Sequence, residues 1–219
     1  MDLPSTDRTK ARRMADRGSY DRELVYSILD EALICHVGFV DGGAPFVIPT
    51  IHTRIGDRLY LHGSPASRML RTAHAADEIC VTATILDGIV FARSALHHSM
   101  NYRSALVLGS GSEVMDKDEK MAVLEAVVEH VAPGRWEECR WPNERELRIT
   151  KVVGLDLNEA SAKVRTGGVK DDGEDRNLPV WAGVLPLFTA AGESESDPEL
   201  LPEVGPSPSV AEWSRSPRR

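Results

Sequence analysis

Residues 59–70 read Leu-Tyr-Leu-His-Gly-Ser-Pro-Ala-Ser-Arg-Met-Leu, and this stretch decides how the first half of the chain folds. A short β-rich run stops at Gly63 and passes straight into helix-forming sequence. Ser64 is a favoured N-cap, and Pro65 has a backbone φ that suits the first position of a helix. The stretch therefore predicts a strand followed at once by a helix from Pro65 to about Ala76.

Polar groups gather at the start of this predicted helix. The free backbone N–H groups, the hydroxyls of Ser64 and Ser67, and the Arg68 guanidinium together form a suitable phosphate site. An ordinary capped helix with a surface arginine explains the same residues equally well. His62 lies one residue before the turn, where it could reach a bound ligand, and its ordinary pKa near neutrality makes it the best candidate for a catalytic proton donor. A buried core histidine is the alternative.

Composition narrows the class of protein. The chain has 219 residues, 42% of them hydrophobic, and a formal net charge of −8, which argues against nucleic acid or an anionic membrane as the partner. Its three cysteines are widely spaced, as expected of a reducing compartment. The N-terminus lacks an apolar signal-like region, and no apolar run reaches the roughly 18 residues of a membrane span. We therefore expect a soluble, cytoplasmic protein that uses a small-molecule substrate.

Three regions follow from the pattern of the sequence. Residues 1–18 form a polar arm, residues 19–188 a folded domain, and residues 189–219 a disordered tail rich in Pro, Ser and Glu with no role in the fold. Within the domain, apolar residues at helical spacing predict helices over 21–33 and 116–131.

The remaining periodic segments are typical of short strands, namely residues 34–40, 45–53, 58–62, 78–86, 89–96, 102–115 and 145–157. Asp87-Gly88, between two of them, is the strongest hairpin signal in the chain. Because strands and helices do not alternate as in βαβ units, we predict an α+β, mostly β fold: a closed antiparallel barrel of six or seven strands with flanking helices.

Three further segments carry candidate site residues. Pro49, within Val47-Ile48-Pro49-Thr50, cannot donate to a sheet and therefore marks an edge strand or backbone turned toward a planar ligand. Adjacent strand residues face opposite sides, so His97-His98 does not predict a metal site. The late basic run could close over an anion or an aromatic ring, or could be a solvated loop; its residues are Lys163, Arg165, Lys170 and, after a charged loop, Trp181.

These segments, in this order across residues 12–188, resemble the flavin-nucleotide-binding split barrels of the pyridoxamine 5′-phosphate oxidase superfamily. The likeness is carried by the Val-Ile-Pro-Thr strand, the 59–70 stretch, the Ile79–Ile85 run, the His97–Val114 segment and the late Lys163-x-Arg165 followed by Trp181. The nitroimidazole-resistance (Nim-like) branch is the most similar. The resemblance implies a split-barrel homodimer that binds FMN at each of two subunit interfaces.

The resemblance also implies roles for individual residues. Val47, Ile48, Pro49 and Thr50 would contact the isoalloxazine through their backbone. Ser67 and Arg68, with Ser64 at the same turn, would hold the phosphate, and Leu61 and His62 would lie beside the ribityl chain or ring. Asn101 and Tyr102 would approach from the second subunit, and Lys163, Arg165 and Trp181 would cap the flavin.

The expected function is that of an FMN-dependent oxidoreductase, nitroreductase-like, acting on small aromatic or xenobiotic acceptors. The alternative is a flavin- or haem-binding split barrel without its own turnover, in which His62 or His97 would ligate haem iron. The chain lacks the basic Arg-x-x-Pro end of the true pyridoxamine phosphate oxidases. Oxidation of vitamin B6 is therefore not expected.

Overall fold

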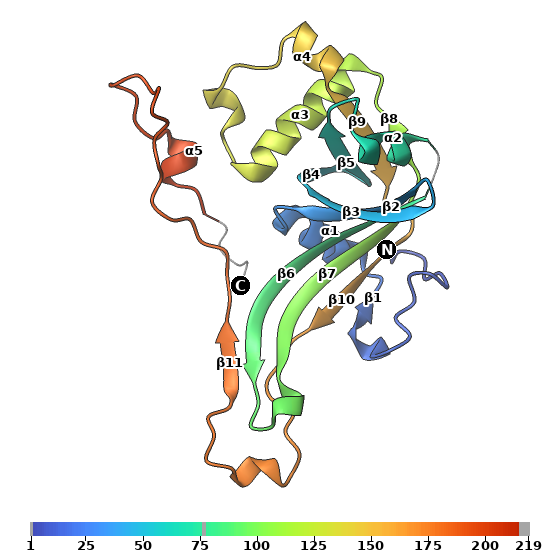
Figure 1. Ribbon diagram of the computed structural model, residues 1–219, viewed down its shortest axis with the longest axis vertical. Helices are drawn as coiled ribbons and strands as arrows, with labels where there is room; N and C mark the ends of the chain where they lie inside the picture. The colour runs from blue at the N-terminus through green and yellow to red at the C-terminus, as the bar shows by residue number, and fades with distance from the viewer. Residues whose placement is uncertain (1, 76–77, 215–219) are drawn as a thin grey trace.

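Two antiparallel sheets form the body of the protein in a computed structural model that describes residues 2–75 and 78–214 (Figure 1). The larger sheet has the strand order β1-β10-β7-β6-β2-β3, with β11 also paired to β6. Its strands are β1 (Gly18–Ser19), β2 (Cys35–Asp41), β3 (Ala44–Thr50), β6 (Ile79–Phe91), β7 (Ser99–Gly109), β10 (Ala160–Arg165) and β11 (Gly183–Pro186). The smaller sheet has the order β4-β5-β9-β8, with β4 (His52–Ile55), β5 (Arg58–Gly63), β8 (Gly111–Glu113) and β9 (Lys151–Asp156). This is the α+β, mostly β split barrel that the sequence predicts.

Helices flank the sheets and begin at polar caps. The α-helices are α1 (Arg22–Glu31), α2 (Arg68–His74), α3 (Lys117–Val131), α4 (Glu144–Ile149) and α5 (Pro208–Ala211), and short 3-10 turns are η1 (Ala15–Arg17), η2 (Ala95–His97), η3 (Trp136–Glu138) and η4 (Asp175–Asn177). The Asp21 side chain accepts from the backbone N–H of Glu23 at the start of α1. Asp116 caps α3 in the same way. The two predicted helices over 21–33 and 116–131 are therefore confirmed within two residues at each end.

The main core fills the space between the two sheets and α1. Val25, Ile28 and Leu29 of α1 are fully buried against Leu59 and the other inward-facing strand residues. Burial of each large aliphatic side chain contributes roughly 1.5–3 kcal/mol. A second cluster lies under α3 on the opposite face of the smaller sheet and contains Tyr60, Val114, Val123, Val127 and Val152.

The strand β6 corrects the strongest hairpin prediction. Residues 79–91 form one continuous strand along β7, and at Asp87 the pairing register shifts between Leu86 and Gly88, as in a β-bulge. Arg103 of β7 donates to both carboxylate oxygens of Asp87, which fixes the bulge. The turn-forming residues therefore bend the strand without reversing it. Together β6 and β7 extend beyond the barrel as a long arm, with β11 alongside (Figure 1).

Three other predicted strands differ from the structure. Residues 45–53 divide into β3 and β4, and residues 102–115 divide into β7 and β8, each pair split between the two sheets. Residues 145–157 are the helix α4 followed by β9. Asn143 and Glu146 form a capping box at the start of α4, and this outweighs the apolar alternation around Leu147 and Ile149.

The helix after the 59–70 stretch starts later than predicted. Ser67, not Ser64, is the N-cap of α2, and its hydroxyl accepts from the backbone N–H of Leu70. Ser64 instead closes a preceding turn, in which its carbonyl accepts from Ser67 N–H at 2.9 Å. The first helical residue is thus Arg68.

Part of the C-terminal tail packs on the body, although the sequence predicts no role for it in the fold. Ser207 and Ser209 donate hydrogen bonds to Glu138 of η3, and these bonds lower the Glu138 pKa to about 2. The indole of Trp213 donates to the carbonyl of Val131 at 2.8 Å. Across the described ranges, no helix combines the length and apolar character needed to cross a membrane.

Candidate functional site

The strand β3 exposes its outer face and one edge to solvent. It is the last strand of the larger sheet, so the prediction that Pro49 marks an edge is confirmed. Val47 is 68% exposed and Pro49 is also exposed, whereas Ile48 and Thr50 are half-buried. Backbone groups on this edge have no strand beside them in the described structure. They are available to hydrogen-bond the edge of a planar ring.

Arg68 joins the start of α2 to the β2–β3 hairpin. Its guanidinium lies 4.5 Å from the centre of the Phe46 ring and 3.4 Å from the Asp41 carboxylate. The side chains of Arg68 and Asp41 are each about half exposed, at 49% and 47%. The strand expected to contact the flavin ring and the turn expected to hold its phosphate are therefore neighbours. The guanidinium of Arg68 between them faces solvent.

His62 points away from the barrel interior. It pairs with Val152 across β5 and β9 and shares a strand face with Tyr60, so its ring turns toward the α3 side of the smaller sheet. The Nδ1 atom is buried and has no hydrogen-bond partner among the described residues. Burial lowers the His62 pKa, so the ring is neutral at pH 7.

Two predicted contact residues are used inside the fold. The Leu61 side chain is 1% exposed in the main core, so only its backbone could face a ligand. Arg165 is 7% exposed and donates to the side chain of Asn101 and to the carbonyls of Gly167 and Gly168. This arginine fastens the loop after β10 to β7 and does not project into solvent.

The remaining predicted residues lie on the arm. Tyr102 pairs with Arg165 across β7 and β10, and Lys163 is half-buried in the same strand. Trp181, 69% exposed, lies beside Phe91 with ring centres 5.9 Å apart and ring planes tilted by 58°. Within one chain this group sits on the arm, while β3 and α2 belong to the barrel end (Figure 1).

A polar cluster at the arm tip contains His97, where the sequence does not predict a metal site. Ligand atoms of His97, Asp172 and Asp175 lie within 4.8 Å of one another. Arg93 holds this loop in place through an ion pair of 2.8 Å with Asp171. The carboxylates are about 75 residues from His97 in sequence, so local spacing could not reveal the cluster.

The comparisons with known proteins agree with this architecture. A family model described as pyridoxamine 5′-phosphate oxidase matches residues 21–164. The chain belongs to the pyridoxamine 5′-phosphate oxidase family. That label names a fold family and does not assign vitamin B6 oxidation to the chain. The comparison with curated proteins found no match to this chain.

Solved structures of the family include two that match nearly the whole chain. The flavocytochrome Anf3 from Azotobacter vinelandii is 40% identical, with a TM-score of 0.88, and the match covers 95% of this chain and 97% of that one. The FAD and haem binding protein from Mycobacterium smegmatis is 33% identical, with a TM-score of 0.84 and coverage of 90% and 96%. A candidate 5-nitroimidazole antibiotic resistance protein from Bacteroides thetaiotaomicron is 25% identical, with a TM-score of 0.55 and coverage of 67% and 86%.

Proposed function

We propose that this chain is a redox protein that binds a flavin and a haem. The observation that carries the proposal is the 40% identity to a flavocytochrome over 95% of the chain. The nitroimidazole-resistance relative covers only 67% of this chain. The likeness to the two haem-containing relatives therefore includes sequence beyond the part shared with the nitroimidazole-resistance protein.

The residues present fit both groups. A flavin offers a phosphate and a planar ring with hydrogen-bonding edges, which suit the Arg68 cation and the open edge of β3. A haem iron would be held by a neutral imidazole. His62 and His97 each carry a buried Nδ1 without a hydrogen-bond partner among the described residues. When bound, the flavin and the haem supply the electron-transfer chemistry.

Residues of the chain itself would bind and orient the flavin. Arg68 would hold the flavin phosphate, and β3 would fix the ring through backbone groups from Val47 to Thr50. His62 is half-buried on the α3 side of the smaller sheet and would act on a ligand only from that side, where its ring would donate a hydrogen bond, or a proton when the imidazole is protonated. The family resemblance implies FMN as the flavin, whereas the mycobacterial relative binds FAD.

An absorption spectrum of the purified protein tests the proposal. We expect flavin bands near ~450 nm together with a haem Soret band near ~400 nm, both properties of the cofactors themselves. Acid extraction followed by chromatography would distinguish FMN from FAD. A protein that contains neither chromophore, even after incubation with both cofactors, would contradict the proposal.

Reduction of small nitroaromatic compounds is the second candidate function. It is favoured by the 25% identity to the nitroimidazole-resistance relative and by the shared fold. Flavin without any haem in the purified protein, combined with turnover of a nitroaromatic acceptor, would favour this function over the first.

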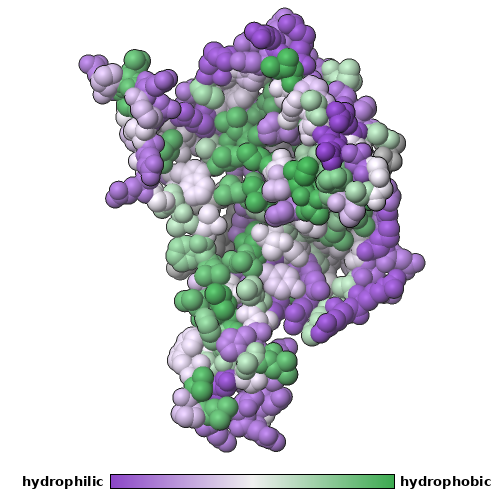
Figure 2. All heavy atoms as spheres, in the orientation of Figure 1, coloured by the Kyte–Doolittle hydropathy of each residue, from purple (hydrophilic) through white to green (hydrophobic). Residues whose placement is uncertain are grey.

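We also propose a homodimer whose sites draw residues from both chains. Hydrophobic residues gather along β11 and the adjoining edge of β6 (Figure 2), where Leu86, Leu185 and Phe188 are 47%, 48% and 69% exposed. Continuous exposed apolar surface of this kind is typical of a protein interface. A second copy that covers the arm would also bring the partner's Asn101 and the partner's Tyr102 toward β3.

Light scattering tests the dimer. The expected mass is twice the 24.1 kDa of one chain. A monomer that retains a full complement of flavin would contradict the proposal that each site draws residues from both chains.

A cytoplasmic location is also part of the proposal and is supported by the three cysteines, which are all free thiols.

A further inference from the structure

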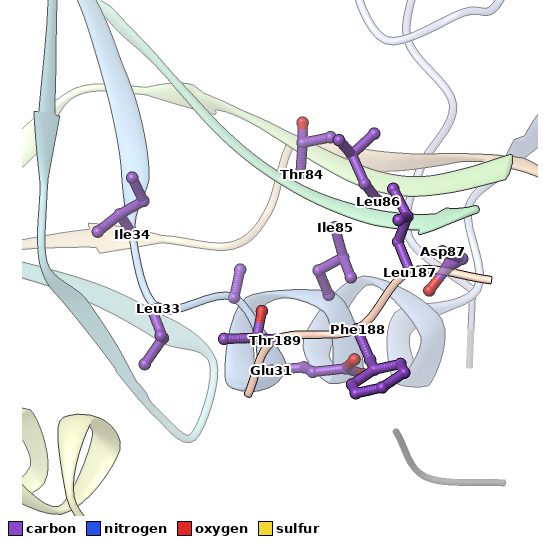
Figure 3. Close-up of a pocket in the computed structure, with 11 residues that line it drawn as sticks. Glu31, Leu33, Ile34, Thr84, Ile85, Leu86, Asp87, Leu187, Phe188 and Thr189 are labelled. Atoms are coloured by element: carbon purple, nitrogen blue, oxygen red, sulfur yellow. The ribbon is translucent and has the colours of Figure 1, made fainter. Parts of the chain in front are cut away.

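A cavity of about 580 Å³ opens beside β6, between the end of α1 and the chain that follows β11 (Figure 3). Its walls include Leu86 and Phe188, which belong to the exposed apolar surface that a second copy would cover. Leu86 also pairs with Tyr102 across β6 and β7, and Tyr102 is one of the residues expected at the flavin. This cavity therefore belongs to the proposed dimer and its cofactor site.

A smaller pocket lies at the opposite end of the body from the arm, between the start of α3 and α4 (Figure 1). Its volume is about 240 Å³, and its lining residues are Met115, Lys117, Lys120, Glu144, Leu147 and Arg148. None of these residues is expected at the flavin, is a candidate haem ligand, or lies on the arm that a second copy would cover. The lining of this pocket is therefore distinct from the sites assigned above.

The lining carries an excess of positive charge. Lys117, Lys120 and Arg148 are cations and only Glu144 is an anion, which leaves a net charge of +2. The chain as a whole has a formal net charge of −8, so this excess is local. Concave surface lined by one sign of charge attracts ligands of the opposite sign.

Carboxylates near the pocket reduce this excess without cancelling it. Asp118 interacts electrostatically with Lys117, which lowers the net charge to +1. The carboxylate of Asp116 accepts from two backbone N–H groups, at 2.8 and 3.0 Å, at the positive end of α3. Glu146 accepts from Arg140 at 2.7 Å, so the charges of these two side chains balance. The pocket therefore still favours an anion.

Two of the three cations keep donors for a ligand. The half-buried Lys120 donates to the carbonyls of Leu147 and Thr150 at 3.3 and 3.0 Å, which hold its side chain against the end of α4. An ammonium has three donors, so one remains. Arg148 is exposed in the last turn of α4 and makes no ion pair within the part of the chain that the structure describes.

The third cation has a partner that a ligand can replace. Lys117 donates to Glu144 at 2.8 Å, and their side chains are 62% and 76% exposed. Ion pairs so exposed contribute little to stability, because water and salt screen them. A ligand carboxylate could therefore take the place of Glu144 beside Lys117.

The rest of the pocket is apolar. Leu147 is 5% exposed and belongs to the packed part of α4, whereas Met115 is 80% exposed. The unbranched methionine side chain adapts to the shape of what it contacts. The volume is below the roughly 300–1,000 Å³ of sites for drug-sized ligands, so a ligand of about one ring fits best.

We propose that the pocket between α3 and α4 binds a small carboxylate with an apolar body of about one ring. Arg148 and the remaining donor of Lys120 would hold the carboxylate, and the body would pack on Leu147 and Met115. The site rests on the charges and walls of this pocket alone. Its failure would leave the flavin and haem proposal untouched.

Calorimetric titration of the purified full-length protein with benzoate and with benzyl alcohol tests the proposal. The two probes share one ring and differ in the negative charge. We expect benzoate to bind at least about tenfold more tightly, with an affinity that falls as salt is added. Arg148→Glu should weaken benzoate binding about tenfold or more, because it replaces the attracting charge with a repelling one.

Variants of opposite sign and a matched control locate the binding. Glu144→Gln should strengthen benzoate binding about threefold or more, because Lys117 then loses its competing carboxylate. Arg145→Glu makes the same charge change as Arg148→Glu at another exposed position of α4 that does not line the pocket, and should change the affinity by less than about threefold.

Three results would each overturn the proposal: no measurable binding of benzoate, equal binding of the two probes, or a folded Arg148→Glu protein that binds benzoate as the wild type does. The third result would place benzoate elsewhere on the protein, for example beside the flavin ring. The absorption spectrum of the same samples reports flavin and haem separately.

Discussion

Replacing His62 with Gln should lower the rate at which the flavin turns over by about 100-fold or more, in the range of a lost general acid. The flavin content and the melting temperature should stay close to those of the wild-type protein. Glutamine keeps a hydrogen-bonding group of similar reach but cannot deliver a proton near neutral pH. Stopped-flow reoxidation of the reduced flavin by a nitroaromatic acceptor would measure the rate.

The buried position of the His62 ring sets the expected pH dependence. Because burial lowers the His62 pKa below its ordinary value, little of the ring is protonated at pH 7. The proton-donating fraction therefore increases as the pH falls toward and below the ordinary histidine value. The wild-type rate should rise over that interval, and the His62→Gln rate should not.

His74 provides the matched control for this substitution. It lies on α2, its side chain is 47% exposed, and its nearest charged partner is Glu113 at 3.6 Å. His74→Gln should leave both the rate and its pH dependence unchanged. If His62→Gln instead removed a haem Soret band, His62 would be an iron ligand, and if it removed the flavin, the residue would serve binding rather than proton transfer.

Local signals in the sequence were sufficient for the parts of the fold that local chemistry determines. Asp21 and Asp116 each precede an apolar helical pattern, and both cap the predicted helices. Pro49 identified an edge strand because its missing N–H has the same consequence in any sheet. These features depend on residues that are near one another in the chain.

The features that the sequence does not predict depend on distant contacts, or on local signals that a competing signal outweighs. Asp87-Gly88 is a sound turn signal, yet Arg103 holds Asp87 in a bulge and β6 continues through it. The Asn143-x-x-Glu146 capping box was present in the sequence and could have revealed α4. By contrast, β11 is four residues long and half-exposed, and it exists because it pairs with β6 about 95 residues earlier.

In the candidate site, too, some features can be predicted from the sequence and others depend on how the chain packs. The family resemblance implies that β3 and the start of α2 are neighbours, and the contact of Arg68 with Phe46 and Asp41 agrees with it. Burial of Leu61 and Arg165 could not be derived, since strand alternation leaves two faces open until the sheets are packed. The cavity beside β6 is lined by residues 31–34, 84–87 and 187–189, and only the folded chain brings these three segments together.

Replacing Arg68 with Ala should weaken binding of FMN by roughly 10- to 100-fold, which corresponds to about 1.5–3 kcal/mol for a hydrogen bond to a charged group. The guanidinium is half-exposed, and in the ligand-free chain its charged partner is Asp41 at a loose 3.4 Å. A phosphate dianion can displace so weakly held a carboxylate. Riboflavin lacks the phosphate, so its affinity should be nearly the same for the wild type and the variant.

Two further variants separate phosphate binding from a structural role of Arg68. Asp41→Asn removes the competing carboxylate and should leave FMN affinity unchanged or increase it, because the guanidinium is then free for the phosphate. Arg71→Ala removes an exposed cation one turn further along α2 and should change FMN affinity little. Fluorescence titration of the apoprotein with FMN and with riboflavin gives each affinity. If Arg68→Ala weakened riboflavin as much as FMN, Arg68 would act by stacking on Phe46 and supporting the β2–β3 hairpin, and the phosphate would have to be held elsewhere.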